Sequence, residues 1–203
     1  MKYELSHLTQ DESQKVCGPI QDDEALLLFA AVRTMRIHNI LEVGGLDGYS
    51  ATNFLKSIIS GKLYTVDINY VKKLADNHIV LRKDCRFVTS KDVPDKIQMI
   101  FFDAHDYDAE LQMFNTLLDQ KIIDEDVTLA FHDTNLHPKK LASWSYLLGR
   151  EKGWCHQTAE RRLVEHFKSL GFDALCFHTK INEPTIPFRH GITLMKKYKP
   201  LVT

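Results

Sequence analysis

Short apolar runs alternate with helix-forming stretches along most of this chain. Seven short runs predict strands, over residues 39–43, 63–66, 86–88, 98–102, 127–131, 174–178 and 191–196. Segments that favour helix lie among them, over residues 25–35, 49–59, 71–79, 108–118 and 158–170. The run at 98–102 is continuously apolar, as are strands that are buried on both faces of a parallel sheet.

This alternation predicts an α/β fold with a Rossmann-like, doubly wound sheet of seven strands and helices on both faces. The last two strands follow one another without a helix. We therefore expect a C-terminal β-hairpin that inserts one antiparallel strand into a mostly parallel sheet. The length fits a single domain over residues 1–203, with residues 1–20 as a polar N-terminal extension.

A glycine-rich turn separates the first predicted strand from its helix. The strand carries Glu42 and runs into Gly44 and Gly45, and Gly48 opens the helix. Such a turn brings backbone close to a ligand at the carboxyl end of the strand. Asp67 ends the next strand, where an acid is well placed to accept hydrogen bonds from ribose hydroxyls. These features indicate a cofactor that contains a nucleoside.

The glycine spacing differs from the G-x-G-x-x-G fingerprint of dinucleotide-binding proteins. Leu46 stands within the turn, and Asp47 puts a negative charge where a pyrophosphate would lie. A cofactor that also carries an ammonium group, S-adenosylmethionine (SAM), fits this pattern better. Glu42 and Asp47 would help bind its cationic end, while Ser50 and the first amides of the helix suit its carboxylate.

The segment from Glu42 to Ser50 resembles the E-x-G-x-x-x-G-Y-S motif of SAM-dependent class I O-methyltransferases, especially the metal-dependent catechol and caffeoyl-CoA type. The terminal hairpin also resembles the methyltransferase variant of the fold. Ser90 and Asp92, after the predicted third strand, are candidates for the adenine. From these motifs and the resemblance we predict the following cofactor-binding residues: Glu42, Gly44, Gly45, Gly48, Tyr49, Ser50, Asp67, Ile68, Ser90, Asp92 and Asp103. A packing turn without a cofactor is the alternative.

Acidic residues also follow the strands at 98–102 and 127–131. Asp103 and Asp133 should meet at one edge of a parallel sheet, where oxygen-rich loops suit Mg²⁺ or another divalent cation. The metal-dependent enzymes have an acid and an Asp-Asn pair at these places. Here Thr134 follows Asp133, so Asn135 is the candidate third ligand, and Asp106 stands where those enzymes often have a lysine base.

The same two segments resemble the D-A-x-H-x-Y and H-D-T motifs of a broader group that includes sugar O-methyltransferases and cephalosporin-hydroxylase-like proteins. This chain is one residue shorter between Asp103 and His105. The resemblance implies that the catalytic residues are His105, His132 and Asp133. We expect His105, or else His132, to take a proton from the acceptor hydroxyl.

The composition limits which binding partners and which cellular location we expect. The net charge is −1 and no basic stripe is present, so neither nucleic acid nor a membrane is expected as a partner. Four scattered cysteines, with no C-x-x-C pair, suggest free thiols rather than a disulfide framework or a zinc site. The N-terminus lacks an apolar signal core, so we expect a cytoplasmic protein. Dimerisation is a family expectation.

The sequence thus favours a SAM-dependent O-methyltransferase that acts on a small molecule or a sugar. A cephalosporin-hydroxylase-like or other SAM-fold enzyme that uses the metal differently is one alternative. A non-catalytic SAM-fold binding module is another, and a nicotinamide-dependent oxidoreductase is disfavoured by the glycine spacing. Acceptor specificity would lie in residues 1–20, 134–157 and 181–190.

Overall fold

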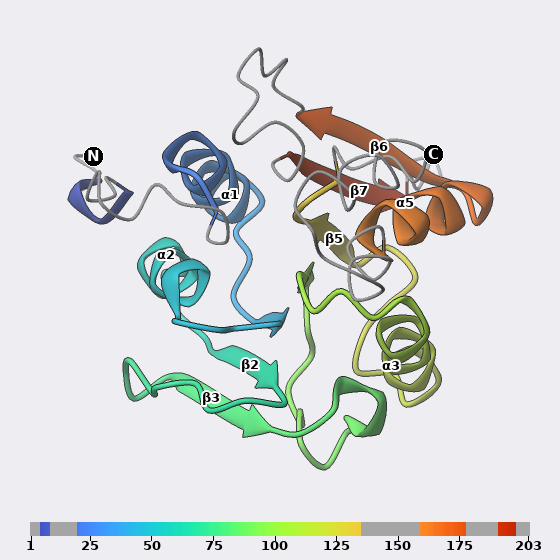
Figure 1. Ribbon diagram of the computed structural model, residues 1–203, viewed down its shortest axis with the longest axis horizontal. Coiled ribbons are helices and arrows are strands. Elements are labelled where there is room, and N and C mark those ends of the chain that lie inside the picture. Colours follow the sequence, from blue (N-terminus) through green and yellow to red (C-terminus); the bar gives the residue numbers. More distant parts are fainter. Residues whose placement is uncertain (1–4, 9–19, 135–158, 178–190, 198–203) are drawn as a thin grey trace, which may run out of the picture.

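The computed structural model describes residues 5–8, 20–134, 159–177 and 191–197 of the chain. One seven-stranded sheet runs through it in the order β3-β2-β1-β4-β5-β7-β6 (Figure 1). The strands are β1 Ile40–Val43, β2 Leu63–Asp67, β3 His78–Arg82, β4 Met99–Phe102, β5 Thr128–Phe131, β6 Phe172–Phe177 and β7 Ile192–Lys197. The α-helices are α1 Asp22–Thr34, α2 Tyr49–Ser57, α3 Tyr107–Asp119 and α5 Ala159–Ser169, and the short 3₁₀ helices are η1 Ser6–Leu8 and η3 Cys85–Phe87.

The strand directions confirm the predicted fold class. β1 pairs with β2 and β4 in parallel, and β2–β3 and β4–β5 are parallel too. β7 is antiparallel to both β5 and β6, so it is the inserted antiparallel strand of the C-terminal hairpin. The strand order reverses at β1, which lies between β2 and β4. Ligands of open α/β sheets bind at such a reversal, outside the carboxyl ends of the strands.

Two helix pairs cover the two faces of the sheet, as Figure 1 shows. On one face, α1 and α2 pack through residues such as Leu28 and Phe54 against Ile40 and Phe101. On the other face, Phe167 of α5 lies with its neighbours against Phe102 and the rest of that core. Successive strand residues point to opposite faces, so a continuous apolar strand fills both cores at once.

The third strand lies elsewhere than the sequence pattern indicates. Residues 71–77 form an irregular segment with a turn, and 78–79 already belong to β3, so the helix predicted over 71–79 is wrong. The strand predicted at 86–88 is also wrong, because η3 occupies most of this segment. The β-branched and leucine side chains of 79–81 pair in parallel with β2 instead. β3 is an edge strand with partly exposed residues, so its apolar signal is short. The residues that follow it are therefore Lys83, Asp84 and Cys85.

The remaining elements match within a few residues. α1 begins at Asp22, earlier than predicted, because the amide of Gln21 donates to the Glu24 carboxylate at 2.8 Å and closes the N-terminal turn. Among the helices that the structure describes, none is long and apolar enough to cross a membrane. Most of residues 1–20 and nearly all of 134–157 and 181–190, where specificity was expected, lie outside the described residues.

Candidate functional site

The glycine turn after β1 lies in direct contact with the end of β4. Gly44 and Gly48 adopt left-handed backbone conformations, with φ of 91° and 78°. A Cβ atom on Gly44 would lie 2.4 Å from the carbonyl oxygen of Asp103. Both the φ angle and this approach require glycine. The turn therefore positions Asp103 directly beside the first strand.

Asp67, at the end of β2, holds the glycine turn from its other side. One carboxylate oxygen accepts hydrogen bonds from the amides of Gly45 and Leu46 at 2.9 and 3.1 Å. The other accepts from the amide of Asn69 at 2.7 Å. Each carboxylate oxygen has two lone pairs, so Asp67 retains capacity for a ligand hydroxyl.

A cavity of about 440 Å³ opens where these strand ends meet. Its volume lies within the range of small-molecule sites, about 300–1,000 Å³. Its walls include the glycine turn, the loop after β2, the residues that follow β3, and the loop after β4. The predicted site residues that line it are Gly44, Asp67, Ile68, Asp103 and His105.

Glu42 and Ser50 lie beneath the turn rather than in the cavity wall. The carboxylate of Glu42 is fully buried and accepts hydrogen bonds of 2.5 Å from the hydroxyls of Ser50 and Thr65. Burial raises the pKa of Glu42 to about 7, although the two hydroxyls oppose the shift. This arrangement joins β1, β2 and the first turn of α2.

Ser90 and Asp92 do not line the cavity. Asp92 forms an ion pair with Lys83 at 2.9 Å and accepts from the amide of Thr89, and the amide of Ser90 donates to Gln120. Because β3 ends earlier than predicted, the position after this strand belongs to Asp84 and Cys85, which do line the cavity. The buried thiol of Cys85 has its pKa raised to about 12.

Seven ionisable side chains gather behind the cavity, and we call them the carboxylate–histidine cluster. They are Glu24, Asp103, His105, Glu110, His132, Asp133 and Glu160. The structure thus brings Asp103 and Asp133 together as predicted from the parallel strand ends. Two sets within it have ligand atoms within 4.8 Å of one another, namely Asp103–His105–Glu160 and Asp103–His132–Asp133.

His105 presents one ring nitrogen to the two aspartates and the other to a glutamate. Nδ1 lies 2.8 Å from a carboxylate oxygen of Glu160, which also accepts from the backbone amide of His105 at 2.9 Å. Nε2 lies 3.9 Å from Asp103 and 4.0 Å from Asp133. Burial would lower the pKa of His105, but the carboxylates, Glu160 first, raise it to about 10.

The backbone at these positions is strained. His105 has a φ of 62° and Asp133 a φ of 54°, both in the left-handed region that side chains rarely adopt. Each such residue costs about 1–3 kcal/mol and persists only where its surroundings enforce it. At the ends of β4 and β5 this strain turns both side chains toward the cluster.

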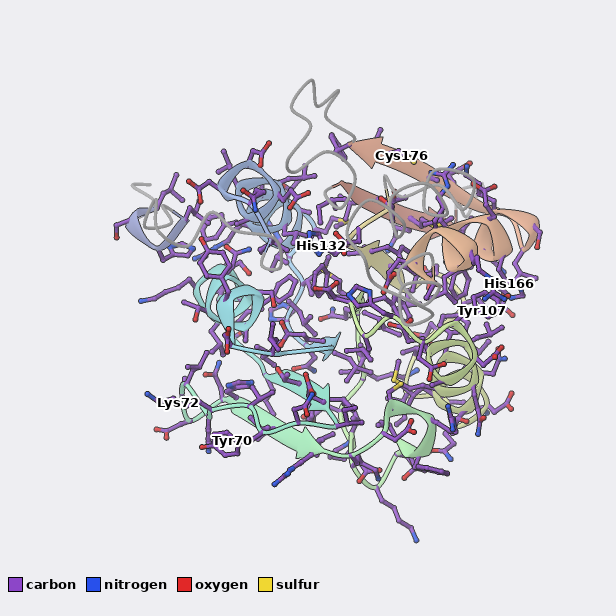
Figure 2. The ribbon with its side chains drawn as sticks, in the orientation of Figure 1. Tyr70, Lys72, Tyr107, His132, His166 and Cys176 are labelled. Carbon is purple, nitrogen blue, oxygen red and sulfur yellow. The ribbon has the colours of Figure 1, made fainter. Side chains whose placement is uncertain are left out.

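His132 has both ring nitrogens engaged by carboxylates. Nε2 lies 3.2 Å from Glu24 of α1 and Nδ1 lies 3.2 Å from Asp103. Figure 2 shows this side chain at the centre of the molecule, between α1 and β5. It is 1% exposed. Burial alone would lower its pKa, but the neighbouring aspartates raise it well above the usual value. His132 thus bridges Glu24 of α1 and Asp103 after β4.

Three glutamates of the cluster were missed by the sequence interpretation. Glu24, Glu110 and Glu160 come from the first turns of α1, α3 and α5, and all three are buried. Each belongs to the buried side of its helix; Glu160, for example, lies one and two turns from Leu163 and Phe167. The sequence signal that could have identified these glutamates is an acidic residue on the apolar face of a helix.

The cluster has the character of a cation site. Five carboxyl groups surround two imidazoles, so negative charge is in excess even when both rings are protonated. One oxygen each of Glu110 and Glu160 is buried without a hydrogen-bond partner among the described residues. The pKa of Glu110 is raised well above its usual value, first by burial and then by Glu160. The residues of the cluster therefore fit a bound cation. Asn135, the predicted third ligand, lies outside the described residues.

Neither the protein-family models nor the curated proteins contain a match to this chain. Among solved structures, a protein provisionally assigned as a caffeoyl-CoA O-methyltransferase from Staphylococcus aureus matches with a TM-score of 0.65 and 14% identity, over 89% of this chain and 86% of that one. An O-methyltransferase from Bacillus cereus in complex with S-adenosylhomocysteine (SAH) matches at 0.60 and 15%, over 91% and 86%. The chain has the O-methyltransferase fold.

An SAH-bound methyltransferase from Podospora anserina also matches, with a TM-score of 0.60 and 15% identity, over 96% of this chain and 87% of that one. The fold shared with these proteins covers nearly the whole chain at low identity. In this chain the terminal hairpin distinguishes the sheet from an all-parallel arrangement.

Proposed function

We propose that this protein is a SAM-dependent methyltransferase that methylates a hydroxyl group of a small molecule or a sugar with the help of a divalent cation. The observation that carries the proposal is the position of the cavity. It lies at the strand-order reversal, between the glycine turn and Asp67 on one side and the Asp103 loop on the other. SAH-bound proteins of the same fold support the choice of cofactor.

The cofactor residues have distinct tasks in this proposal. Asp67 would accept hydrogen bonds from the ribose hydroxyls, and Ile68, with Asp84 and Cys85, would lie near the adenine. Gly44, Gly45 and Gly48 would let backbone approach the methionine part, next to Tyr49 and Ser50 at the N-terminus of α2. Glu42 would keep Ser50 in place.

SAM supplies an activated methyl group on a sulfonium. In the transfer, the bond from sulfur to methyl breaks, a bond from the acceptor oxygen to methyl forms, and the sulfonium becomes the neutral thioether of SAH. The hydroxyl proton must leave to a base. The role of the protein is to hold oxygen, methyl and sulfur in line and to exclude water.

A divalent cation between Asp103 and Asp133 would lower the pKa of the acceptor hydroxyl. Both aspartates follow adjacent parallel strands, Asp103 in the cavity wall and Asp133 buried behind it. His105 lies in the cavity wall beside them. Its Nε2 suits either of two roles, acceptance of the hydroxyl proton or ligation of the cation.

The proposal is tested first by calorimetry with SAH in metal-free buffer, on the purified full chain. Micromolar binding that Asp67→Asn weakens and Asp124→Asn does not would support the cofactor assignment, since Asp124 is exposed and far from the cavity wall. A panel of hydroxyl acceptors with labelled SAM and added cation then tests for a methylated product. A hydroxylated product would favour the hydroxylase-like alternative.

A further inference from the structure

We propose that Nε2 of His105 is a ligand of the divalent cation, together with one carboxylate oxygen each of Asp103 and Asp133. Because one ligand is nitrogen, the site would bind ions of the Mn²⁺ to Zn²⁺ series in preference to Mg²⁺. This inference rests on the proposed function, since it concerns the same cavity edge, but it assigns His105 to the metal rather than to proton transfer.

The position of Nε2 of His105 relative to the two aspartates carries the assignment. Nε2 of His105 lies 3.9 Å from Oδ1 of Asp103 and 4.0 Å from Oδ2 of Asp133. These separations are too long for hydrogen bonds. Atoms that are each about 2.1 Å from one ion lie about 3–4 Å apart, so the separations from Nε2 to the two carboxylate oxygens are those of ligands that share an ion.

Glu160 orients the imidazole for this role. Its carboxylate accepts a hydrogen bond from Nδ1 of His105 at 2.8 Å, and it lies at the buried start of α5. A carboxylate accepts and does not donate, so in the neutral ring that binds a metal the proton resides on Nδ1 and the lone pair of Nε2 faces the two aspartates. A carboxylate on the far nitrogen is the usual support of a metal-bound histidine.

His132 is less suited to the same role. Both of its ring nitrogens already face carboxylates at 3.2 Å, Glu24 on one side and Asp103 on the other. It would have to give up the contact with Asp103 to bind a metal. The same comparison explains why two histidines so close together have different tasks, one structural and one open toward the cavity.

A second observation points independently to a bound cation. The other carboxylate oxygen of Glu160 is buried with no hydrogen-bond partner in the part of the chain that the structure describes, and the residue is 0% exposed. Buried carboxylates are ordinarily paired or bound to metal. One ligand atom each of Asp103, His105 and Glu160 lie within 4.8 Å of one another, so the Glu160 carboxylate belongs to the same group of possible ligands.

The donor set decides the kind of ion. Mg²⁺ prefers oxygen ligands and retains several waters, whereas imidazole nitrogen suits Zn²⁺ and its neighbours in the first transition series. A site made of two carboxylates and one imidazole therefore favours Zn²⁺ or Mn²⁺ over Mg²⁺. A site in which His105 only accepts a proton would show no such preference.

The test uses the full chain after chelator treatment, with zinc, manganese or magnesium chloride as the probe. Calorimetry should give a Zn²⁺ affinity at least about 100-fold above that for Mg²⁺. Imidazole ¹⁵N spectra, assigned with the His105→Asn variant, should show the Nε2 resonance of His105 moving as Zn²⁺ is added. Glu160→Gln should lower Zn²⁺ affinity about 10–100-fold. His38→Asn, in an exposed histidine before β1, should change nothing.

A His105 resonance that stays in place at saturating Zn²⁺ would overturn the assignment, as would equal affinities for Mg²⁺ and Zn²⁺. The wild-type spectrum decides even if a variant fails to fold. Calorimetry with SAH in metal-free buffer reports on the cofactor alone. SAH binding without any cation binding would therefore refute this inference and leave the proposed cofactor intact. Cation binding without SAH binding would refute the proposed cofactor.

Discussion

The contact between the glycine turn and Asp103 gives a sharp prediction for Gly44→Ala. The new Cβ would lie 2.4 Å from the Asp103 carbonyl oxygen and 2.7 Å from its carbon, and both neighbours are backbone atoms. Overpacking of this kind costs about 1–3 kcal/mol. The left-handed φ of 91° adds about 1–2 kcal/mol for a residue with a side chain. The free energy of unfolding should therefore fall by about 2–5 kcal/mol.

Gly171→Ala is the matched control. Gly171 has a similar φ of 85°, but nothing lies within 4 Å of its would-be Cβ, so only the backbone term of about 1–2 kcal/mol applies. Urea denaturation of the two variants should differ by about 1–3 kcal/mol. SAH affinity should fall only in Gly44→Ala, because only this variant moves the turn away from Asp103. Equal stability losses and equal SAH affinities would refute the reasoning.

Three further variants test other parts of the structure. Asp133→Asn should leave SAH affinity unchanged, since Asp133 does not line the cavity, and should lower Zn²⁺ affinity more than about 10-fold in calorimetry; a loss of SAH affinity instead would contradict the division of roles. The pKa of Glu42 is raised from 4.5 to about 7, so the folded state holds its proton more tightly and stability should fall as pH rises through this interval, by roughly 3 kcal/mol. Glu42→Gln should remove this contribution in urea denaturation at pH 5 and pH 8, and an unchanged pH slope would count against it. Phe167→Ala should lower the free energy of unfolding by about 3–5 kcal/mol, because its buried ring contacts four other phenylalanines, whereas Phe177→Ala, 39% exposed, should cost far less; similar losses would show that the core is placed wrongly.

Much of the fold is predictable from the sequence because the central strands are buried on both faces. β4 is a continuous apolar run, and β1 and β5 each contain one polar residue, Glu42 and Thr128. A glycine, an aspartate or a histidine follows each of these strands. Parallel pairing then places Asp103 level with His132, next to Asp133, without any knowledge of side-chain contacts. The glycine turn is also predictable from the sequence, since the backbone conformations of Gly44 and Gly48 favour glycine.

The parts that were missed depend on contacts between distant segments. Glu24, Glu110 and Glu160 occupy first turns of helices, where acids are common because they favour the helix dipole. Their convergence follows from topology, since helices that return to a doubly wound sheet begin near the carboxyl ends of its strands. The third strand was misplaced because an edge strand carries a weak apolar pattern. That error placed the expected adenine contacts at Ser90 and Asp92, which do not line the cavity, whereas Asp84 does.

The most direct test of the account is isothermal titration of the metal-free protein with SAH. We predict micromolar binding, about −8 kcal/mol, weakened by about 10–100-fold in Asp67→Asn because a charged hydrogen-bond acceptor of the ribose is lost. Asp124→Asn should bind SAH as the wild type does. Absence of binding to the wild-type protein would contradict the methyltransferase assignment and leave a methyltransferase fold with a different ligand.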